Sequence, residues 1–521
     1  EAERRPNIVI VMTDQQRADI SAREGFPLDT TPFLDSLARR GTWFNRAYTS
    51  APVCAPARIS MLTGRYPNTH RVRENRGIPY ATYTVDLFDV ARGLGYATAM
   101  IGKNHSHLRP DRLDHWFELG HAAGAKWAWD TKYIDKTADK PWANPVHEPD
   151  DPRRPEERAF DRWLLVLNHS TGLTATPFPV ECQGPYRAVS DACQWIGSLK
   201  GHPFCLWLTF AEPHNPYQVP EPYFSMFPPD SLPPVTAGKE ALSAKGFKWQ
   251  WTRRLGEYAR PNYEQEIPRA RANYFGMLRL IDDQVRRFVQ FLTAEGLWEN
   301  TLFIFVTDHG DFVGEYGLVR KGPEMPEVLM RVPLFFVGPG VHADALPHPA
   351  FVSIVDIFPT ICEYLGVDLP AGVQGQSLWP LLKGDAYPTD EFASVYGEQG
   401  FGGLHYTDDD NPDYEHCMMP GVVRPAFDEL NSYSQSGTMR MLRKGDWKLV
   451  MDMQGAGQLY DLSRDPLELN NLYYDARFTS IRGELLAELL AWTLRAQDPL
   501  PYPKDKNIIK TDPRNFWSPY R

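Results

Sequence analysis

The chain has 521 residues, of which 42% are hydrophobic, and it carries a formal net charge of -11. This length is enough for one large hydrophobic core, or for a large domain together with a smaller one. The negative charge argues against a nucleic-acid-binding surface, and no apolar run approaches the roughly 20 residues of a membrane span. We therefore expect neither nucleic acid nor a membrane as a partner.

The N-terminal residues 1–6 are charged and lead directly into an apolar run, without the pattern of a signal peptide. This favours a cytoplasmic protein, or a periplasmic or secreted one if the first residue, which is not Met, marks a trimmed start. The six cysteines are scattered and form no CxxC pair. Neither a zinc site nor a disulfide framework is therefore indicated.

Five short apolar runs predict strands that are buried on both faces of a sheet. They cover residues 7–13, 96–101, 204–210, 301–306 and 332–337. Helical patterns lie between them. One begins at Thr31-Pro32 and ends before Gly41, and another has apolar residues at three-four spacing over residues 277–292. Strands that alternate with helices predict an α/β fold, with a large, mostly parallel sheet sandwiched by helices.

Two proline-rich stretches, residues 140–158 and 213–234, are predicted to be long loops. The pattern changes past about residue 390. Residues 442–452 and 458–462 predict a small antiparallel sheet, and residues 481–495 predict an amphipathic helix. We therefore expect a main α/β domain over residues 1–390 and a smaller C-terminal α+β subdomain over residues 391–521.

Polar residues follow four of the predicted strands. They are Asp14-Gln15, Lys103-Asn104-His105, Glu212-Pro213-His214 and Asp308-His309-Gly310. The carboxyl ends of parallel strands form the ligand-binding edge of an α/β sheet. We therefore expect these groups, which are far apart in sequence, to converge on one site.

Part of this set has the composition of a metal site. Asp14, Gln15, Asp308 and His309 offer three oxygen-bearing side chains and one imidazole. Oxygen ligands favour hard cations such as Ca²⁺, Mg²⁺ or Mn²⁺, and the nitrogen donor makes Mn²⁺ more favourable than it is in an all-oxygen site. Ca²⁺ is the first expectation. A turn cap is the alternative for Asp14 taken alone.

The segment Cys54-Ala55-Pro56-Ala57-Arg58, which is followed by Leu62-Thr63-Gly64-Arg65, resembles the signature of the sulfatase family in the alkaline phosphatase superfamily. Further segments resemble that family in the same order along the chain, from Asn7 to about Leu472. They are Lys103-Asn104-His105, Pro213-His214-Asn215-Pro216, residues 315–322 around Lys321, and the closing segment that begins at Asp446.

The resemblance implies an alkaline-phosphatase-like fold and oxidation of Cys54 to formylglycine by a formylglycine-generating enzyme. It implies a set of catalytic residues, which are Cys54, Arg58, Lys103, His105, His214 and Lys321. It also implies that Asp14, Gln15, Asp308 and His309 bind one divalent cation.

The mechanism that follows from the resemblance is hydrolysis of a sulfate monoester. One hydroxyl of hydrated formylglycine attacks sulfur, and Asp308 helps to take its proton. His214, with Lys321, protonates the leaving alcohol. His105 then removes the proton of the second hydroxyl, the aldehyde reforms and sulfate leaves. Lys103 and Lys321 hold sulfate oxygens, while Arg58 holds the diol.

The chain departs from the family pattern at two positions. Many sulfatases have a second Asp where this chain has Gln15, and Asn where it has His309. The set present here is similar to that of phosphonate monoester and phosphodiester hydrolases of the same superfamily, which are the nearest alternative. Two other classes stay open: an enzyme with Cys54 as a thiol nucleophile, and a sulfate-binding protein without activity.

The substrate is less well defined by the sequence. A sulfated carbohydrate is favoured, and aryl and choline sulfates stay open, as does assembly into a homo-oligomer. Residues 73–76, Arg-Glu-Asn-Arg, follow the signature and are candidates for the border of the cleft, with an ordinary surface loop as the alternative. His70 and His107 match no motif of the family.

Overall fold

The computed structural model describes residues 5–120, 154–167, 170–260, 262–402, 406–407, 409–410, 434–497 and 514–516. A seven-stranded sheet lies at its centre, with the strand order β2-β8-β7-β1-β6-β4-β5. The strands are β1 (Asn7–Thr13), β2 (Thr42–Phe44), β4 (Ala97–Gly102), β5 (His115–Glu118), β6 (Phe204–Thr209), β7 (Thr301–Thr307) and β8 (Leu334–Val337). β8 runs antiparallel to both its neighbours, whereas β5, β4, β6, β1 and β7 are parallel. The predicted mixed, mostly parallel sheet is therefore confirmed.

Strand β1 lies in the middle of this sheet, and all seven of its residues are buried. Successive side chains of a strand point to opposite faces of the sheet. Ile8 and Ile10 accordingly pack into the core on one face, and Val9 and Val11 into the core on the other. An unbroken apolar run is what a strand covered on both faces requires.

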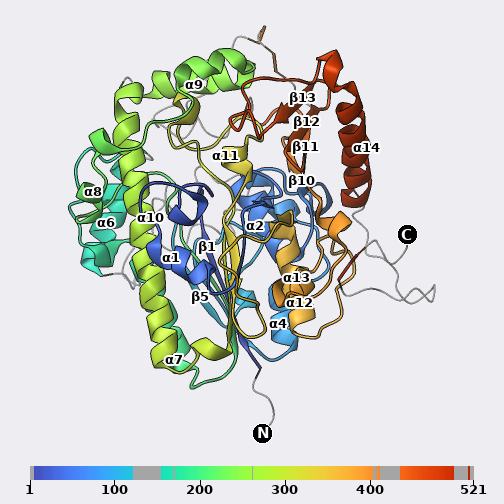
Figure 1. Cartoon of the computed structure of the whole chain (residues 1–521). Helices are drawn as coiled ribbons and strands as arrows, with labels where there is room; N and C mark the ends of the chain where they lie inside the picture. The colour runs from blue at the N-terminus through green and yellow to red at the C-terminus, as the bar shows by residue number, and fades with distance from the viewer. Residues whose placement is uncertain are drawn as a thin grey trace, which may run out of the picture.

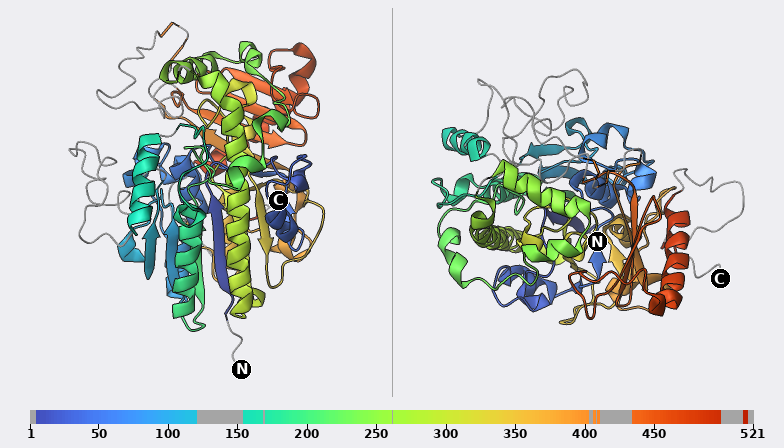
Figure 2. Two further views of the ribbon diagram at one scale, coloured as in Figure 1. Left: turned by 90° about the vertical axis from the view of Figure 1, so that its left-hand side faces the viewer. Right: turned by 90° about the horizontal axis from the view of Figure 1, so that it is seen from above.

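Helices cover both faces of the sheet (Figures 1 and 2). One face packs against α1 (Pro32–Ala38), α7 (Gly184–Ser198) and α10 (Tyr263–Ala294). The other face packs against α2 (Cys54–Thr63), α4 (Leu87–Gly93), α12 (Ile357–Tyr364) and α13 (Trp379–Lys383). The shorter or more peripheral helices are α3 (Pro67–His70), α6 (Pro155–Leu167), α8 (Tyr223–Met226), α9 (Phe247–Ala259) and α11 (Glu327–Met330). A separate pair of short parallel strands consists of β3 (Ala47–Tyr48) and β9 (Val352–Ser353).

Several elements differ from the predictions. Strands β2 and β5 were not predicted, because three or four residues are too few to produce a recognisable pattern. Helix α10 begins well before the predicted stretch at residue 277. Most of the predicted loop over residues 140–158 lies outside the described residues, and its last four residues belong to α6. The predicted loop over residues 213–234 is irregular apart from short helical turns such as α8.

The C-terminal part contains an antiparallel sheet in the order β10-β11-β12-β13. Its strands are β10 (Ser394–Gln399), β11 (Met439–Lys444), β12 (Trp447–Asp452) and β13 (Gly457–Asp461). Helix α14 (Thr479–Ala496) packs on one face through Leu485, Leu489 and Trp492. The other face packs on Tyr48 and Met330 of the main unit. The predicted C-terminal sheet and helix are confirmed, with β10 as an additional strand, while the boundary at residue 390 stays a prediction.

The C-terminal sheet faces the edge of the main sheet at which the parallel strands have their carboxyl ends (Figure 1). In Figure 1, β1 begins near the N-terminus at the bottom and runs upward, so its carboxyl end points toward the C-terminal sheet. Residues that follow the parallel strands therefore lie between the two sheets. None of the helices in the described ranges combines the length and the apolar composition that crossing a membrane requires.

Candidate active site

Helix α2 places Cys54 at its first turn, where the side chain is buried with the residue only 1% exposed. The residue before it, Val53, provides no side-chain cap. Instead, the backbone N–H of Ala55 donates to Asn75 Oδ1 at 3.0 Å. The helix ends at Gly64, whose φ of +65° suits glycine, and an added Cβ there would lie 2.7 Å from Val373. The helix is therefore fixed at both ends, and its N-terminus, which favours anions, lies beside Cys54.

Two carboxylates and two cations surround this N-terminus. Arg58 Nε donates to Asp308 Oδ2 at 2.8 Å, and its Nη2 lies 3.3 Å from Asp14 Oδ2. Lys103 Nζ donates to Asp14 and lies 3.7 Å from Cys54 Sγ. The Arg58 and Asp308 side chains are fully buried. Burial by itself raises the pKa of Asp308, but His309, Arg58 and Lys103 hold it below its usual value, so this carboxylate stays ionised.

His309 directs one ring nitrogen into the same space. Its Nδ1 donates to the carbonyl of Gly310 at 2.9 Å, which leaves Nε2 with its lone pair. That Nε2 lies 3.2 Å from Cys54 Sγ and 3.7 Å from one oxygen each of Asp14 and Asp308. Burial lowers the pKa of His309 to about 4, so the imidazole is neutral at neutral pH.

These four side chains form a group suited to a metal ion. One ligand atom from each of Asp14, Cys54, Asp308 and His309 lies within 4.8 Å of the other three. A histidine that donates its other nitrogen to a carbonyl is typical of metal ligands, because that hydrogen bond fixes the tautomer. The donor set therefore fits a divalent cation. We call these four residues, with Arg58 and Lys103, the site cluster.

Gln15 is held by both its backbone and its side chain. Its φ of +68° is unusual for a residue with a side chain, and its N–H donates to Asp308 Oδ1 at 3.0 Å. Its amide oxygen accepts from Lys321 Nζ at 2.9 Å, and its amide nitrogen donates to Asp311 Oδ2 at 2.7 Å. The predicted fourth ligand thus has its oxygen engaged by Lys321 in this structure.

Lys321 and His214 lie together. Lys321 Nζ is 3.1 Å from His214 Nε2, and His214 Nδ1 donates to the carbonyl of Asn215 at 2.6 Å. Lys321 therefore links His214 to Gln15, and through it to Asp308.

His105 is half-buried and lies two residues after Lys103 in the same loop, with φ of +45°. Burial, together with the positive charges of Lys103, Arg58 and Lys321, lowers the pKa of His105 well below its usual value. The neutral form is therefore the stable one, and it is able to accept a proton.

The sequence of this chain matches a known protein family. The family model described as Sulfatase matches residues 6–367. The chain belongs to the sulfatase family. Curated sulfatases cover nearly the whole chain as well: an arylsulfatase of Clostridium perfringens is 27% identical over 93% of this chain and 94% of its own, and a choline-sulfatase of Rhizobium meliloti is 28% identical over 91% and 83%. By class, this sulfatase-family protein is a sulfuric ester hydrolase.

Other relatives of this sulfatase-family chain carry different names. The multifunctional alkaline phosphatase superfamily protein PehA of Trinickia caryophylli is 27% identical over 95% of this chain and 96% of its own. Among solved structures, the phosphonate monoester hydrolase of Agrobacterium radiobacter has a TM-score of 0.71 at 24% identity, covering 94% of this chain and 96% of its own. A 2-O GAG sulfatase has a TM-score of 0.67 at 22% identity, covering 98% and 96%. The structural likeness confirms the alkaline-phosphatase-like fold.

Sequence reasoning missed several residues that support the site. Asp311 accepts from Gln15, from Tyr217 OH at 2.7 Å, and from the backbone N–H of Arg320 at 3.0 Å. Thr209, at the end of β6, accepts from Arg58 Nη1 at 2.8 Å. Asp311 was recognisable in principle, since it follows the same strand end as Asp308. Thr209 was not, because only the folded sheet brings it to Arg58.

The two histidines without a motif have structural partners. His70 Nδ1 accepts from the N–H of Val72 at 3.2 Å, and its Nε2 lies 3.0 Å from Ser60 Oγ on α2. His107 lies 2.7 Å from Asp86, the cap of α4. Both histidines contact helices of the sulfatase fold, and within the described residues neither makes a hydrogen bond to the site cluster.

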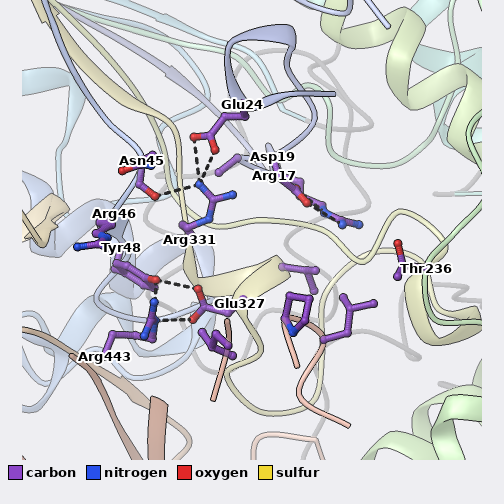
Figure 3. A pocket seen from close by; sticks show the side chains of 15 residues that line it. Arg17, Asp19, Glu24, Asn45, Arg46, Tyr48, Thr236, Glu327, Arg331 and Arg443 are labelled. Atoms are coloured by element: carbon purple, nitrogen blue, oxygen red, sulfur yellow. Dashed lines mark hydrogen bonds and ion pairs between the residues drawn. The ribbon is translucent and has the colours of Figure 1, made fainter. Parts of the chain in front are cut away.

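A second group of buried charges lies between the main unit and the C-terminal sheet, beside a pocket of about 450 Å³ that none of the predicted site residues lines (Figure 3). Glu327, at the start of α11, accepts from Tyr48 OH at 2.7 Å and lies 3.4 Å from Arg443. Lys448 lies 3.3 Å from Glu327 and 2.7 Å from Glu468. We call these five residues the Glu327 cluster.

Proposed function

We propose that this protein hydrolyses a sulfate monoester, with formylglycine formed from Cys54 as the source of the nucleophile. The observation that carries the proposal is the position of Cys54. Its sulfur lies at a helix N-terminus, 3.2 Å from His309 and 3.7 Å from both Asp14 and Lys103. A tetrahedral anion placed there meets N–H groups and cations together.

Asp14, Asp308 and His309 are the proposed ligands of a divalent cation, with Gln15 as the fourth through the amide oxygen that Lys321 now holds. Ca²⁺ is preferred, since most of these donors are oxygens. When bound, the cation would withdraw electrons from the oxygens around it and so make a hydroxyl on residue 54 more acidic.

Hydrated formylglycine supplies two hydroxyl groups on one carbon, the first for attack and the second for release of sulfate. Arg58 orients that carbon, because its guanidinium is fixed by Asp308, Asp14 and the neighbouring loop. Lys103 and Lys321 hold the sulfate oxygens and offset the charge that grows on them during transfer.

Two histidines have the proton-transfer roles. His214 is proposed to protonate the leaving alcohol, and Lys321 is the adjacent source of positive charge, 3.1 Å from His214 Nε2. His105 is proposed to take the proton of the second hydroxyl, since its lowered pKa keeps it neutral. Replacement of His214 by Asn would then slow esters of aliphatic alcohols far more than esters of nitrophenol, whose leaving group needs little protonation.

A phosphonate monoester or phosphodiester is the second candidate substrate class. Gln15 and His309 support it, because this set of metal ligands is similar to that of phosphonate monoester and phosphodiester hydrolases, and because Gln15 has no negative charge where many sulfatases have Asp. Lys103 and His105 favour sulfate, because they complete the K-x-H motif of sulfatases. Relative kcat/KM on matched sulfate, phosphate and phosphonate esters of one alcohol decides between the two classes.

Within the sulfate class, we favour a carbohydrate sulfate and expect a formylglycine-generating enzyme as the maturation partner. The first test of the whole proposal is mass spectrometry of the peptide that contains residue 54, from protein whose turnover has been measured. Active protein in which residue 54 is entirely a thiol would refute the aldehyde mechanism. A screen of aryl, choline and sugar sulfates with the same preparation then identifies the substrate class.

A further inference from the structure

Two arginines near the nucleophile lack an acidic partner. Arg73 follows α3, and Arg440 belongs to β11. Within the described part of the chain, neither makes an ion pair, and the one hydrogen bond of the Arg440 guanidinium goes to the carbonyl of Met439. The Arg73 Nη2 atom is buried without a hydrogen-bond acceptor. Other arginines, such as Arg187 and Arg269, also have a buried nitrogen without an acceptor, but each makes another hydrogen bond, whereas the Arg73 guanidinium makes none within the described residues.

Arg73 is tied to the first turn of α2. Asn75, two residues further on, accepts from the N–H of Ala55, next to Cys54. Val72, on the other side of Arg73, packs in one apolar cluster with Ala55 and Ile59. The backbone around Arg73 therefore lies directly against the helix that carries the nucleophile.

Arg440 reaches the same area from the C-terminal sheet. It is paired in register with Glu398 of β10, so the two side chains project from the same face. The N–H of Glu398 donates to the carbonyl of Ser50 at 2.8 Å, four residues before Cys54. The next residue, Gln399, donates to the carbonyl of Gly322 at 3.0 Å, beside Lys321. The end of β10 thus lies between the loops that carry Cys54 and Lys321.

Glu398 is an acid whose charge acts on both arginines, but its oxygens are already engaged. One accepts from the N–H of Asn68 at 2.9 Å and the other lies 3.2 Å from Tyr396 OH, and the residue is 1% exposed. It partly offsets two positive charges without forming an ion pair with either arginine. The guanidinium donors of Arg73 and Arg440 therefore stay available for a ligand.

We propose that Arg73 and Arg440 form a second anion-binding subsite, which holds a carboxylate or a second sulfate of the substrate while the first sulfate lies at Cys54. A guanidinium matches the planar or tetrahedral oxyanion with two parallel hydrogen bonds. The subsite rests on the proposed ester hydrolysis and deepens it, because it selects polyanionic substrates, such as a sulfated disaccharide that also carries a uronate or another sulfate.

The test uses three matched disaccharides with the same scissile sulfate: one with no other charge, one with a carboxylate and one with a second sulfate. For wild type we expect kcat/KM to be higher on one or both dianionic substrates. In Arg73→Gln and Arg440→Gln it should fall about 10- to 100-fold on the preferred dianion, as expected for loss of a charged hydrogen bond. It should stay within about threefold on the reference disaccharide, whose only charge is the scissile sulfate. The comparison of carboxylate with sulfate identifies which anion the subsite takes.

Arg76→Gln is the matched control, because Arg76 is exposed in the same loop and loses the same charge. Arg73→Lys keeps the charge without the planar donors and should recover part of the preference. Thermal unfolding of each variant shows whether it folds. If Arg73→Gln does not fold, the kinetics of Arg440→Gln alone test the subsite. Equal loss on all three substrates, or no loss in either variant, would overturn the subsite.

The subsite and the proposed sulfatase activity can fail independently of each other. If the wild type hydrolyses phosphonates or phosphodiesters and no sulfates, the sulfatase proposal fails. The same charge series is then prepared with that ester at the scissile position. A dianion preference that Arg73→Gln abolishes supports the subsite there too, and its absence contradicts the subsite.

Discussion

The site cluster and the Glu327 cluster are both buried groups of acids and bases, yet they differ in how their atoms are used. In the Glu327 cluster, two carboxylates face one lysine, one arginine and a tyrosine hydroxyl. Each charged group has a partner of opposite charge within the cluster. In the site cluster, the Cys54 thiol donates to Asp14, whereas His309 Nε2 keeps a lone pair 3.7 Å from one oxygen each of Asp14 and Asp308.

The difference teaches how a functional charge cluster is recognised. Burial and ion pairing are common to both clusters, so neither property identifies a site. Electron-pair donors that crowd one point repel one another unless a proton, a cation or a substrate lies between them. The Glu327 cluster joins α11 to the C-terminal sheet and is expected to contribute to stability, whereas the site cluster is expected to contribute to catalysis.

Substitution of Cys54 in the site cluster is expected to have the largest effect on activity. Cys54→Ala removes the proposed source of the nucleophile, and we expect kcat/KM to fall by about 10⁴-fold or more, with little change in the melting temperature. Cys54→Ser should be nearly as inactive, because a serine sulfate has no second hydroxyl for release. Steady-state kinetics on the best sulfate ester measures both. Cys193→Ser, away from the site, serves as the control, and an active Cys54→Ala protein would rule out residue 54 as nucleophile.

Removal of one carboxylate from the site cluster is the next largest change. Asp308→Asn keeps the shape but loses the charge that faces Arg58, and we expect about a 10³-fold loss of kcat/KM together with loss of bound divalent metal. Metal content by elemental analysis, before and after dialysis against a chelator, provides the direct readout. Full activity of chelated wild type, with no metal in the protein, would contradict the metal site.

The equivalent change in the Glu327 cluster should have the opposite outcome. Glu327→Gln leaves Lys448 and Arg443 with less compensating charge, and breaking such a buried pair costs about 3 kcal/mol of unfolding free energy. We expect kcat/KM of the folded protein to stay within about threefold of wild type. Urea unfolding and kinetics on the same sample separate the two effects. A large catalytic loss without destabilisation would mean that the two clusters are functionally coupled.

A smaller effect concerns pH and His70, under α2. Burial lowers the pKa of His70 to about 3, from 6.5 in the unfolded chain, so below pH 6.5 the unfolded state binds a proton that the folded state does not. Stability from this residue is complete above pH 6.5 and is lost as the pH falls toward 3, by about 2 kcal/mol at pH 5. His70→Gln should narrow the difference in unfolding free energy between pH 7 and pH 5 by that amount. His202→Gln, at an exposed position, should leave it unchanged.

Much of the architecture was predictable because the central strands are continuous apolar runs. Strands β1, β6 and β7 begin at their predicted residues, since burial on both faces leaves little choice of side chain. Strands β2 and β5 were not predictable, because these short segments are extended only through their pairing with β8 and β4.

The same distinction holds at the site. Side chains that directly follow a strand, such as Asp14 and Asp308, were predictable from the rule that strand ends converge. The engagement of Gln15 by Lys321 was not, because it depends on a left-handed backbone at Gln15 and on a loop more than 300 residues away. The availability of Arg73 depends in turn on where Glu398 finds its own donors.

The near-complete burial of Cys54 also sets an order of events during biosynthesis. A residue that is 1% exposed at the base of a packed helix is out of reach of another enzyme's active site. The proposed oxidation of its side chain to an aldehyde would therefore take place before this segment folds. Under the proposed function, maturation and folding would then compete in time, and a chain that folds first would keep residue 54 as a thiol. The yield of active protein would then depend on the relative rates of modification and folding. Slower synthesis or a surplus of the maturation enzyme should raise that yield.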